Sequence, residues 1–166
     1  MPEVYAFPFR ARAINGKRVF RPVFTVRLQG PSGMVRGPML VDSGADCSLI
    51  DSRQATRLGL KLDATRRGRV VGRRLGVSRS ELLLEVYHPS GWLPPLRIPV
   101  EIPSEPMRLP FAVLGREGFF EAFDVAFLLG PNPERGMFCL SPVERRLRRR
   151  PIARWDNARK HARIAA

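Results

Sequence analysis

The chain has few of the residues that build metal centres and disulfide frameworks. Its 166 residues include only two cysteines, Cys47 and Cys139, and only two histidines, His88 and His161. No group of these residues has the spacing of metal ligands, so we expect no zinc or iron site and no cofactor. Two cysteines also argue against a disulfide framework, which small secreted domains build from several pairs.

Long apolar runs are absent as well. No stretch approaches the ~18 consecutive apolar residues that predict a transmembrane helix, so we expect no membrane span. The first residues, Met1 to Tyr5, lack the basic and then apolar arrangement of a signal peptide. Reduced thiols in a cytoplasmic protein are therefore the simplest expectation.

Lysine is rare, occurring only at positions 17, 61 and 160, yet arginine brings the formal net charge to +14. The hydrophobic content of 44% and the charged content of 27% are ordinary for a soluble globular protein. A chain of this length can bury a hydrophobic core, and we expect one domain with at most one appendage.

The positive charge is concentrated at the C-terminal end. Residues 142–166 contain eight arginines and one lysine against two acidic residues, so this segment carries +7. One interpretation is a solvated tail, which is common for runs of like charge. The alternative is a segment that contacts nucleic acid or an anionic membrane surface. No nucleic-acid-binding motif accompanies it.

The stretch Met39–Ile50 is the one around which we interpret the rest of the chain. Three apolar residues lead into Asp42, small residues follow, and the stretch ends apolar. This composition predicts a buried strand that delivers one carboxylate to a tight turn. Gly44 allows a sharp turn and a close approach by another group, and Ser43 and Asp46 can bond to the backbone of the turn. Taken alone, Asp-Ser-Gly is equally compatible with an ordinary junction between a strand and a turn.

A second stretch, Phe111–Phe127, changes that interpretation. An apolar strand at Ala112–Leu114 meets Gly115 and Arg116, and a short helix and another apolar strand follow. In this order and about 70 residues apart, the two stretches resemble those of the retropepsin-like aspartic proteases, in particular their bacterial members. In that family Asp-(Thr/Ser)-Gly-Ala carries the catalytic carboxylate, and a later hydrophobic-hydrophobic-Gly-Arg motif folds behind it. The resemblance covers roughly residues 19–142.

The resemblance implies an all-β domain with one or two short helices, folded as the single-lobe closed β-barrel of these proteases and active as a homodimer. It divides the chain into an N-terminal extension (1–17), a protease domain (18–142) and a basic tail (143–166). The implied activity is that of an aspartic endopeptidase with protein or peptide substrates.

The resemblance also implies roles for individual residues. Asp42 is the implied catalytic carboxylate, supported by Gly44 and by Ser43, whose hydroxyl bonds across the dimer in the family. Ala45 and Asp46 are implied to meet the substrate. Asp46 is also implied to pair with Arg116 of the second motif. We expect this pair to be buried, and breaking a buried ion pair on one side is costly. The supporting residues of the second motif are Gly115 and Arg116.

Residues 65–80 contain six arginines and three glycines. One interpretation is a solvated surface hairpin. By position, the resemblance makes this hairpin the flap that closes over the substrate, with Val70, Val71 and Gly72 near its tip. The adjacent glycines that such flaps often carry are missing here, and the arginines are consistent with acidic substrates.

Periodicity and turn residues predict the remaining elements. A half-buried strand should form a hairpin with the strand entering Asp42, and a helix capped by Asp51 or Ser52 should end near Leu58, before Gly59. Pro99 would place its strand at a sheet edge or a bulge. Residues 1–17 give little signal, and in the family the last strand often helps to build the dimer interface. The expected strands are 19–28, 81–87, 96–102, 112–114, 123–129 and 137–140, with a loop at 91–95, an extended segment at 103–110 and a short helix at about 116–122.

Peptide hydrolysis by this route requires two carboxylates that share one proton. The chain has one Asp-Ser-Gly turn and is too short for two lobes, so a second Asp42 must come from another copy in a C2 homodimer. Cys47 has no histidine near it in the sequence, and we interpret it as a small buried residue and not as a nucleophile.

Three functions compete. The first is a homodimeric endopeptidase, which the intact Asp-Ser-Gly favours because a protein without catalysis has no chemical need for that carboxylate. The second is a binding module that has kept the fold without useful activity. The third is a basic nucleic-acid-associated protein in which the motif is incidental.

Overall fold

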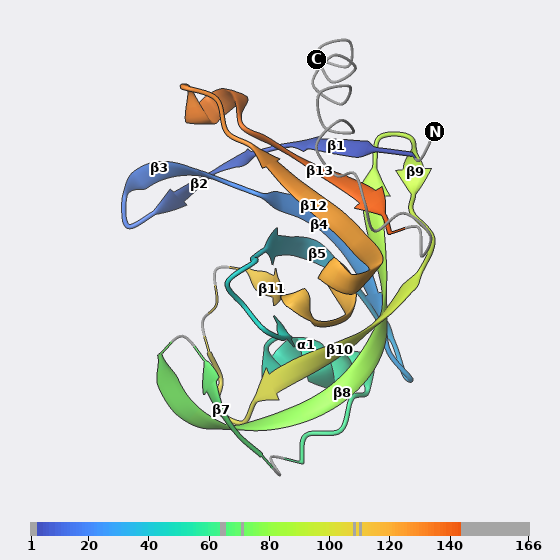
Figure 1. The fold of residues 1–166 in the computed structure, drawn as a ribbon. Helices are drawn as coiled ribbons and strands as arrows, with labels where there is room; N and C mark the ends of the chain where they lie inside the picture. Colours follow the sequence, from blue (N-terminus) through green and yellow to red (C-terminus); the bar gives the residue numbers. More distant parts are fainter. Residues whose placement is uncertain (1–2, 64–65, 71, 108, 110, 144–166) are drawn as a thin grey trace. The chain divides into compact units, whose positions relative to one another are not determined.

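A computed structural model describes residues 3–63, 66–70, 72–107, 109 and 111–143 of the chain (Figure 1). Strands dominate this part, with short helical segments between them, so the predicted mainly-β class is confirmed. The chain divides into two compact units, one formed by Val23–Phe119 and one by Met1–Pro22 together with Phe120–Ala166. No helix in the described ranges is long and apolar enough to cross a membrane.

The larger unit begins with the hairpin that the sequence predicts. Strand β4 (Val23–Gln29) pairs antiparallel with β5 (Met34–Val41), and β5 ends directly before Asp42. The single strand expected around β4 is broken at Pro22, which has no N–H to donate to a neighbouring strand. The residues before this proline form a separate strand, β3 (Lys17–Arg21), in the other unit.

Six strands of the larger unit form a closed barrel. Their hydrogen-bonded order is β10-β6-β11-β5-β4-β8, and β10 also pairs with β8, which closes the ring. Strands β5 and β11 are parallel and in register, so Val41 lies beside Leu114 where both strands end. The bounds of the strands not yet given are β6 (Ser48–Leu49), β8 (Arg73–His88), β10 (Leu96–Pro103) and β11 (Ala112–Leu114).

Strand β10 is not the edge or bulged strand that Pro99 suggests. It pairs with β8 over its whole length and with β6 at Val100 and Glu101. Pro99 stands one residue before the second pairing begins, which is how a proline fits into a strand with neighbours on both sides. The loop expected at residues 91–95 also differs, because Gly91–Trp92 forms a short strand, β9, paired with β8.

Helix α1 (Ser52–Leu58) confirms the predicted capping. The Asp51 side chain accepts a hydrogen bond from the Gln54 N–H at 2.7 Å, and the Gln54 side chain accepts one from the Asp51 N–H at 3.3 Å. Gly59 ends the helix in the left-handed conformation with a φ of 72°.

Strand β8 contributes to two hydrophobic clusters. From Leu82 onward its even-numbered side chains are buried. Nearer its start, Leu75 and Val77 are buried instead, and they pack with Leu49 and Val70. Because side chains alternate between the faces of a strand, β8 changes its buried face after Val77. The largest fully buried side chains of this unit are Phe24, Leu28, Met39, Ile50, Leu58, Leu84, Ile98, Ile102, Leu114 and Phe119.

Strand β7 (Arg66–Val70) forms a hairpin with the first part of β8 and is the last strand of the sheet (Figure 1). Val70 pairs with Arg73, which confirms the predicted turn between them. Gly72 lies in this turn with a φ of 77°, a conformation that favours glycine. Val71, which was predicted at the tip, lies outside the described residues.

The smaller unit contains elements that the sequence did not predict. Strand β1 (Tyr5–Pro8) lies in the N-terminal segment that gave little signal, and β2 (Arg10–Ile14) pairs with β3. β13 (Met137–Pro142) lies between β1 and β12 (Phe123–Leu128), antiparallel to both, and a 3-10 turn at Pro133–Arg135 precedes it. Both backbone edges of β13, the strand that the resemblance links to dimerisation, are therefore occupied within the chain.

Candidate active site

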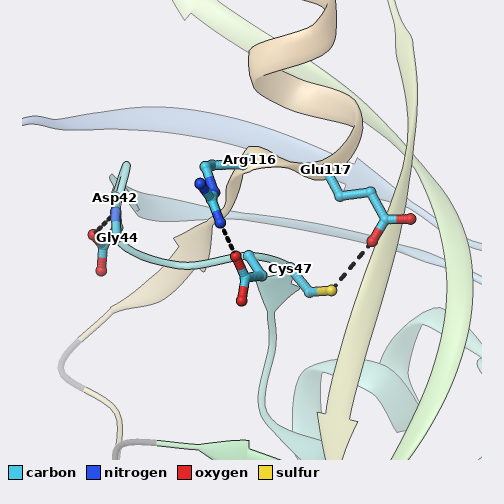
Figure 2. Close-up of polar contacts among 6 residues, drawn as sticks. Asp42, Gly44, Cys47, Arg116 and Glu117 are labelled. Atoms are coloured by element: carbon cyan, nitrogen blue, oxygen red, sulfur yellow. Dashed lines mark hydrogen bonds and ion pairs between the residues drawn. The ribbon is translucent and has the colours of Figure 1, made fainter.

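Asp42 lies at the end of β5 and is held by β11. Its N–H donates to the Leu114 carbonyl at 3.0 Å, and its own carbonyl accepts from the Ala45 N–H at 3.2 Å. The Asp42 side chain is half-buried, and its Oδ1 accepts a hydrogen bond from the Gly44 N–H at 2.9 Å (Figure 2). One carboxylate oxygen is thus fixed by the turn that follows it.

Gly44 contributes through close approach and not through a left-handed backbone. A Cβ at this position would lie 3.2 Å from Asp42 Oδ1, which is tighter than ordinary van der Waals contact. Its φ is outside the positive range, so the conformational freedom expected from the sequence is not what the turn uses. Ser43 and Gly44 are both exposed beside the half-buried carboxylate.

The Asp42 loop (residues 42–48) lies along the segment that follows β11. The Arg116 N–H donates to the Ala45 carbonyl at 2.8 Å, and the Glu117 N–H donates to the Asp46 carbonyl at 2.9 Å. The Gly115 N–H donates to the buried Ser48 Oγ at 3.2 Å. The two sequence motifs, about 70 residues apart, are therefore joined mainly through their backbones.

Gly115 is required by this contact. A Cβ on Gly115 would lie 2.9 Å from the Cα of Cys47 and would overlap its carbonyl group. The obstacle is backbone, which cannot rotate away as a flexible side chain could. The supporting role predicted for Gly115 thus has a direct steric cause.

The predicted ion pair between Arg116 and Asp46 is present, with Arg116 Nη2 bonded to Asp46 Oδ1 (Figure 2). The expectation that it is buried is wrong for the single chain. The two side chains are 62% and 80% exposed. Exposed pairs contribute about 0–1 kcal/mol because solvent screens them, so this pair adds little to the backbone contacts beneath it.

Glu117 is a site residue that the sequence did not single out. It accepts a hydrogen bond from Cys47 Sγ at 3.2 Å (Figure 2). It also forms an ion pair with Arg79 of β8. The short helix expected here is irregular, with a ψ of 127° at Glu117 and a φ of 77° at Gly118. This conformation lets the segment contact the Asp42 loop and β8 at once. Its place directly after Gly-Arg was the only sequence signal for such a role.

Cys47 has the inert environment expected from the sequence. Burial, and after it the hydrogen bond to Glu117, raise the pKa of its thiol to about 12. The thiol therefore stays protonated at neutral pH and is a poor nucleophile. Cys139, the second free cysteine, is buried, and burial raises its pKa to about 11.

The residues predicted for the flap lie in the β7–β8 hairpin. Val70 is buried against Leu49, just after the Asp42 loop, while Gly72 is exposed in the turn. Met107 and Leu109 pack against the same cluster, which also includes Leu75, Val77 and Val113. The structure brings together Asp42, Gly44, Ala45, Asp46, Gly115 and Arg116, and the described hairpin residues join them through the cluster and through the Arg79–Glu117 pair.

Metal ligation is not a feature of this site in the part of the chain that the structure describes. No group of three or more histidine, cysteine, aspartate or glutamate residues there could hold a metal ion. The chemically distinctive group is a half-buried carboxylate, held by the backbone of its own turn and placed next to a hairpin.

Comparison with solved structures shows a retropepsin-like fold. The chain is similar to a retropepsin-like aspartic protease from Rickettsia conorii, with a TM-score of 0.50 and 19% identity over 86% of this chain and 94% of that one. The EIAV protease in complex with the inhibitor HBY-793 matches with a TM-score of 0.37 and 18% identity, over 58% of this chain and 82% of that one. The retroviral protease-like domain of Ddi1 from Leishmania major gives 0.36 and 21%, over 66% and 82%.

No protein-family model matches the chain, and no curated protein matches its sequence. At 19% identity, the similarity to the Rickettsia conorii structure establishes the fold alone. The resemblance that the two motifs indicated is confirmed at this level, including the closed barrel.

Proposed function

We propose that this protein is an aspartic endopeptidase of the retropepsin type. The observation that carries the proposal is the position of Asp42: a half-buried carboxylate at the end of a barrel strand, with one oxygen held at 2.9 Å by the Gly44 N–H. The exposed Asp46–Arg116 pair and the backbone contacts beneath it hold the loop that presents this carboxylate.

The chemistry follows from two such carboxylates brought close together. Like charges at short distance do not both ionise easily, so the pair retains one proton. The ionised carboxylate takes a proton from water while the protonated one donates to the carbonyl oxygen of the peptide. The rate should therefore be highest where the pair holds one proton and should fall when it gains a second or loses its last.

The second carboxylate has to come from another copy of the chain. The sequence contains one Asp-Ser-Gly, and the one closed barrel positions that single turn. A C2 homodimer with the site on its axis supplies the pair. Because β13 is already paired on both sides, the partner would meet the outer edges of β1 and β12 or the side chains of this sheet. In this dimer Ser43 would bond across the axis, Ala45 and Asp46 would meet the peptide, and the β7–β8 hairpin would cover it.

The test is cleavage of a peptide library by wild type and by Asp42→Asn, with and without pepstatin. We expect the substitution to abolish cleavage, pepstatin to inhibit the wild type, and the melting temperature to stay the same. Asp63→Asn is the matched control, because it makes the same chemical change at an exposed aspartate of the larger unit. Cleavage at the wild-type rate by a pure preparation of Asp42→Asn would contradict the assignment of Asp42 as the catalytic residue.

We also propose that the protein works in a reducing compartment such as the cytoplasm. The support is chemical: both cysteines are free, and Cys139 is fully buried.

A further inference from the structure

The β7–β8 hairpin is strongly charged, and its charge is all positive between Asp63 and Glu81. Between Asp63 and Glu81 the sequence contains six arginines and no acidic residue. Between the barrel strands β4 and β8, by contrast, Arg27 is paired with Glu85 at 2.6 Å. The arginines of this stretch are Arg66, Arg67, Arg69, Arg73, Arg74 and Arg79.

Two of these arginines have partners within the chain. Arg79 pairs with Glu117, and Arg73 pairs with Glu105 at 3.3 Å. The side chains of Arg66, Arg67 and Arg74 are exposed, and the described residues give none of them an acidic partner. The hairpin therefore presents at least three guanidinium groups that are not neutralised.

The register brings like charges close together. Arg67 pairs with Gly76, and Arg74 pairs with position 69, two residues further along β7. Positions 67 and 69 lie on the same face of the strand, so Arg67 and Arg74 are diagonal neighbours on that face. Like charges at neighbouring cross-strand positions destabilise a hairpin. Arginine on an edge strand can prevent unwanted strand pairing, which would explain Arg67 on β7. The same explanation applies to Arg74, because at this position β8 pairs only with β7.

The opposite face of the hairpin combines apolar and cationic groups. Val70, Leu75 and Val77 are buried on it, and the register places Arg66 opposite Val77 and Arg73 opposite Val70. Because cross-strand partners share a face, an apolar strip is bounded by an arginine at each end. This strip is already covered within the chain by Leu49, Met107 and Leu109. The exposed charge that a peptide can meet is therefore that of Arg67 and Arg74 on the other face.

We propose that the hairpin selects peptide substrates that carry acidic side chains near the cleaved bond. This inference rests on the proposed function, since it describes what the same site accepts. The physical basis is electrostatic complementarity, which raises the encounter rate and the affinity of oppositely charged partners and weakens as salt is added.

The experiment uses three peptides with one apolar core and flanking Glu, Gln or Lys residues. The value of kcat/KM is measured at low and high salt for wild type and for the double variant Arg67→Gln/Arg74→Gln. The double variant Arg21→Gln/Arg53→Gln is the control, because it removes two exposed arginines outside the hairpin and changes the net charge equally. Binding of the same peptides to Asp42→Asn provides a readout that does not need cleavage.

We expect wild type and the control to prefer the Glu peptide to the Gln peptide, and the Lys peptide to be the poorest. Losing two exposed charge pairs should reduce the preference by about two- to thirtyfold. High salt should reduce it in the same direction.

Equal cleavage of the Glu and Gln peptides, still dependent on Asp42, would overturn the inference and leave the proposed function intact. Absence of cleavage by wild type, with the binding preference present, would contradict the proposed function and support the inference. Loss of oligonucleotide binding in the hairpin variant without any change in peptide preference would mean that the arginines serve nucleic acid, and the proposal would be wrong.

Discussion

The Asp42 loop and the β7–β8 hairpin are held in contrasting ways. The loop is fixed by backbone hydrogen bonds to Leu114, Arg116 and Glu117 and by the close approach of Gly115. The hairpin is the last part of the sheet, and β8 pairs with β10 only from Val77 onward. Before that residue, a backbone bond from the Ser104 N–H to the Gly76 carbonyl, a small apolar cluster and a largely exposed ion pair attach it. Side-chain contacts of that kind are weaker and more sensitive to solvent than a backbone ladder.

The contrast matches what the proposed catalysis requires. A carboxylate that activates water must stay close to one geometry, because small displacements cost large factors in rate. A cover over the substrate must open and close, so it is built from contacts that can be broken. Arg79 and Glu117 connect the two parts, and substitutions on either side of this link can show how different they are.

The largest effect on stability is expected from Gly115→Ala. Its Cβ would overlap the carbonyl group of Cys47, and we expect a loss of about 3 kcal/mol in the free energy of unfolding together with loss of activity. Gly72→Ala in the hairpin meets no atom within 4 Å, and its cost comes only from a φ of 77°, about 1 kcal/mol. Gly37→Ala, with open space and no positive φ, is the control. Thermal unfolding of the three variants gives the ranking. Equal losses of unfolding free energy for Gly115→Ala and Gly72→Ala would contradict the difference between the Asp42 loop and the hairpin.

A smaller effect is expected from Arg116→Ala. Because the pair with Asp46 is exposed, we expect a loss of about 1 kcal/mol or less in the free energy of unfolding. The pair is isolated by a double-mutant cycle with Asp46→Asn, which leaves the backbone bonds of both residues in place. A coupling of several kcal/mol in the monomer would show that the pair is shielded from water after all.

The smallest effect concerns pH and the Cys47 thiol. Its pKa in the folded chain is raised from an ordinary value of 9.0 to about 12, so the folded state holds this proton more tightly than the unfolded state. The resulting stability is present below the unfolded pKa and is lost as pH rises toward the folded one. Glu117→Gln should lower the thiol pKa but leave it elevated, because burial is the larger cause. The pH dependence of labelling by a thiol reagent measures the pKa of Cys47. The measurement is made in a Cys139→Ala variant, so that Cys47 is the only thiol labelled. Rapid labelling of Cys47 at neutral pH would contradict this environment.

Much of the larger unit could be predicted from local signals. The capped helix after Ile50 and the hairpin into Asp42 depend on residues close together in the chain. The turn at Gly72 was placed through the resemblance. Asp42 and Arg116 could be placed in one site only through the resemblance, because the hydrogen bonds that join their segments are backbone bonds, which any residue can make.

Other features could not be predicted because they depend on distant partners. The N-terminal strand β1 is defined by its pairing with β13, about 130 residues away, and its own four residues carry little periodicity. The strand that contains Pro99 was predicted wrongly for the same reason. The local rule for proline takes no account of β6, which pairs with β10 just after Pro99. Glu117 was missed because its partner Arg79 lies in another strand. Residues 144–166, with the predicted basic tail, lie outside the described residues, and their contact with nucleic acid or an anionic surface stays a prediction.

The most direct test of the account is a mixing experiment between wild type and Asp42→Asn. The two chains are refolded together in equal amounts, at a concentration where the protein is dimeric, and total activity is compared with that of wild type alone at the same total number of chains. If every site needs two Asp42 carboxylates, only wild-type pairs are active, so total activity should fall to about one quarter of the value for that all-wild-type sample. Random pairing of equal amounts makes one dimer in about four wild type on both sides, while the equivalent all-wild-type sample is active throughout. Total activity that stays at one half would show that a single chain carries a complete site, and it would contradict the shared pair.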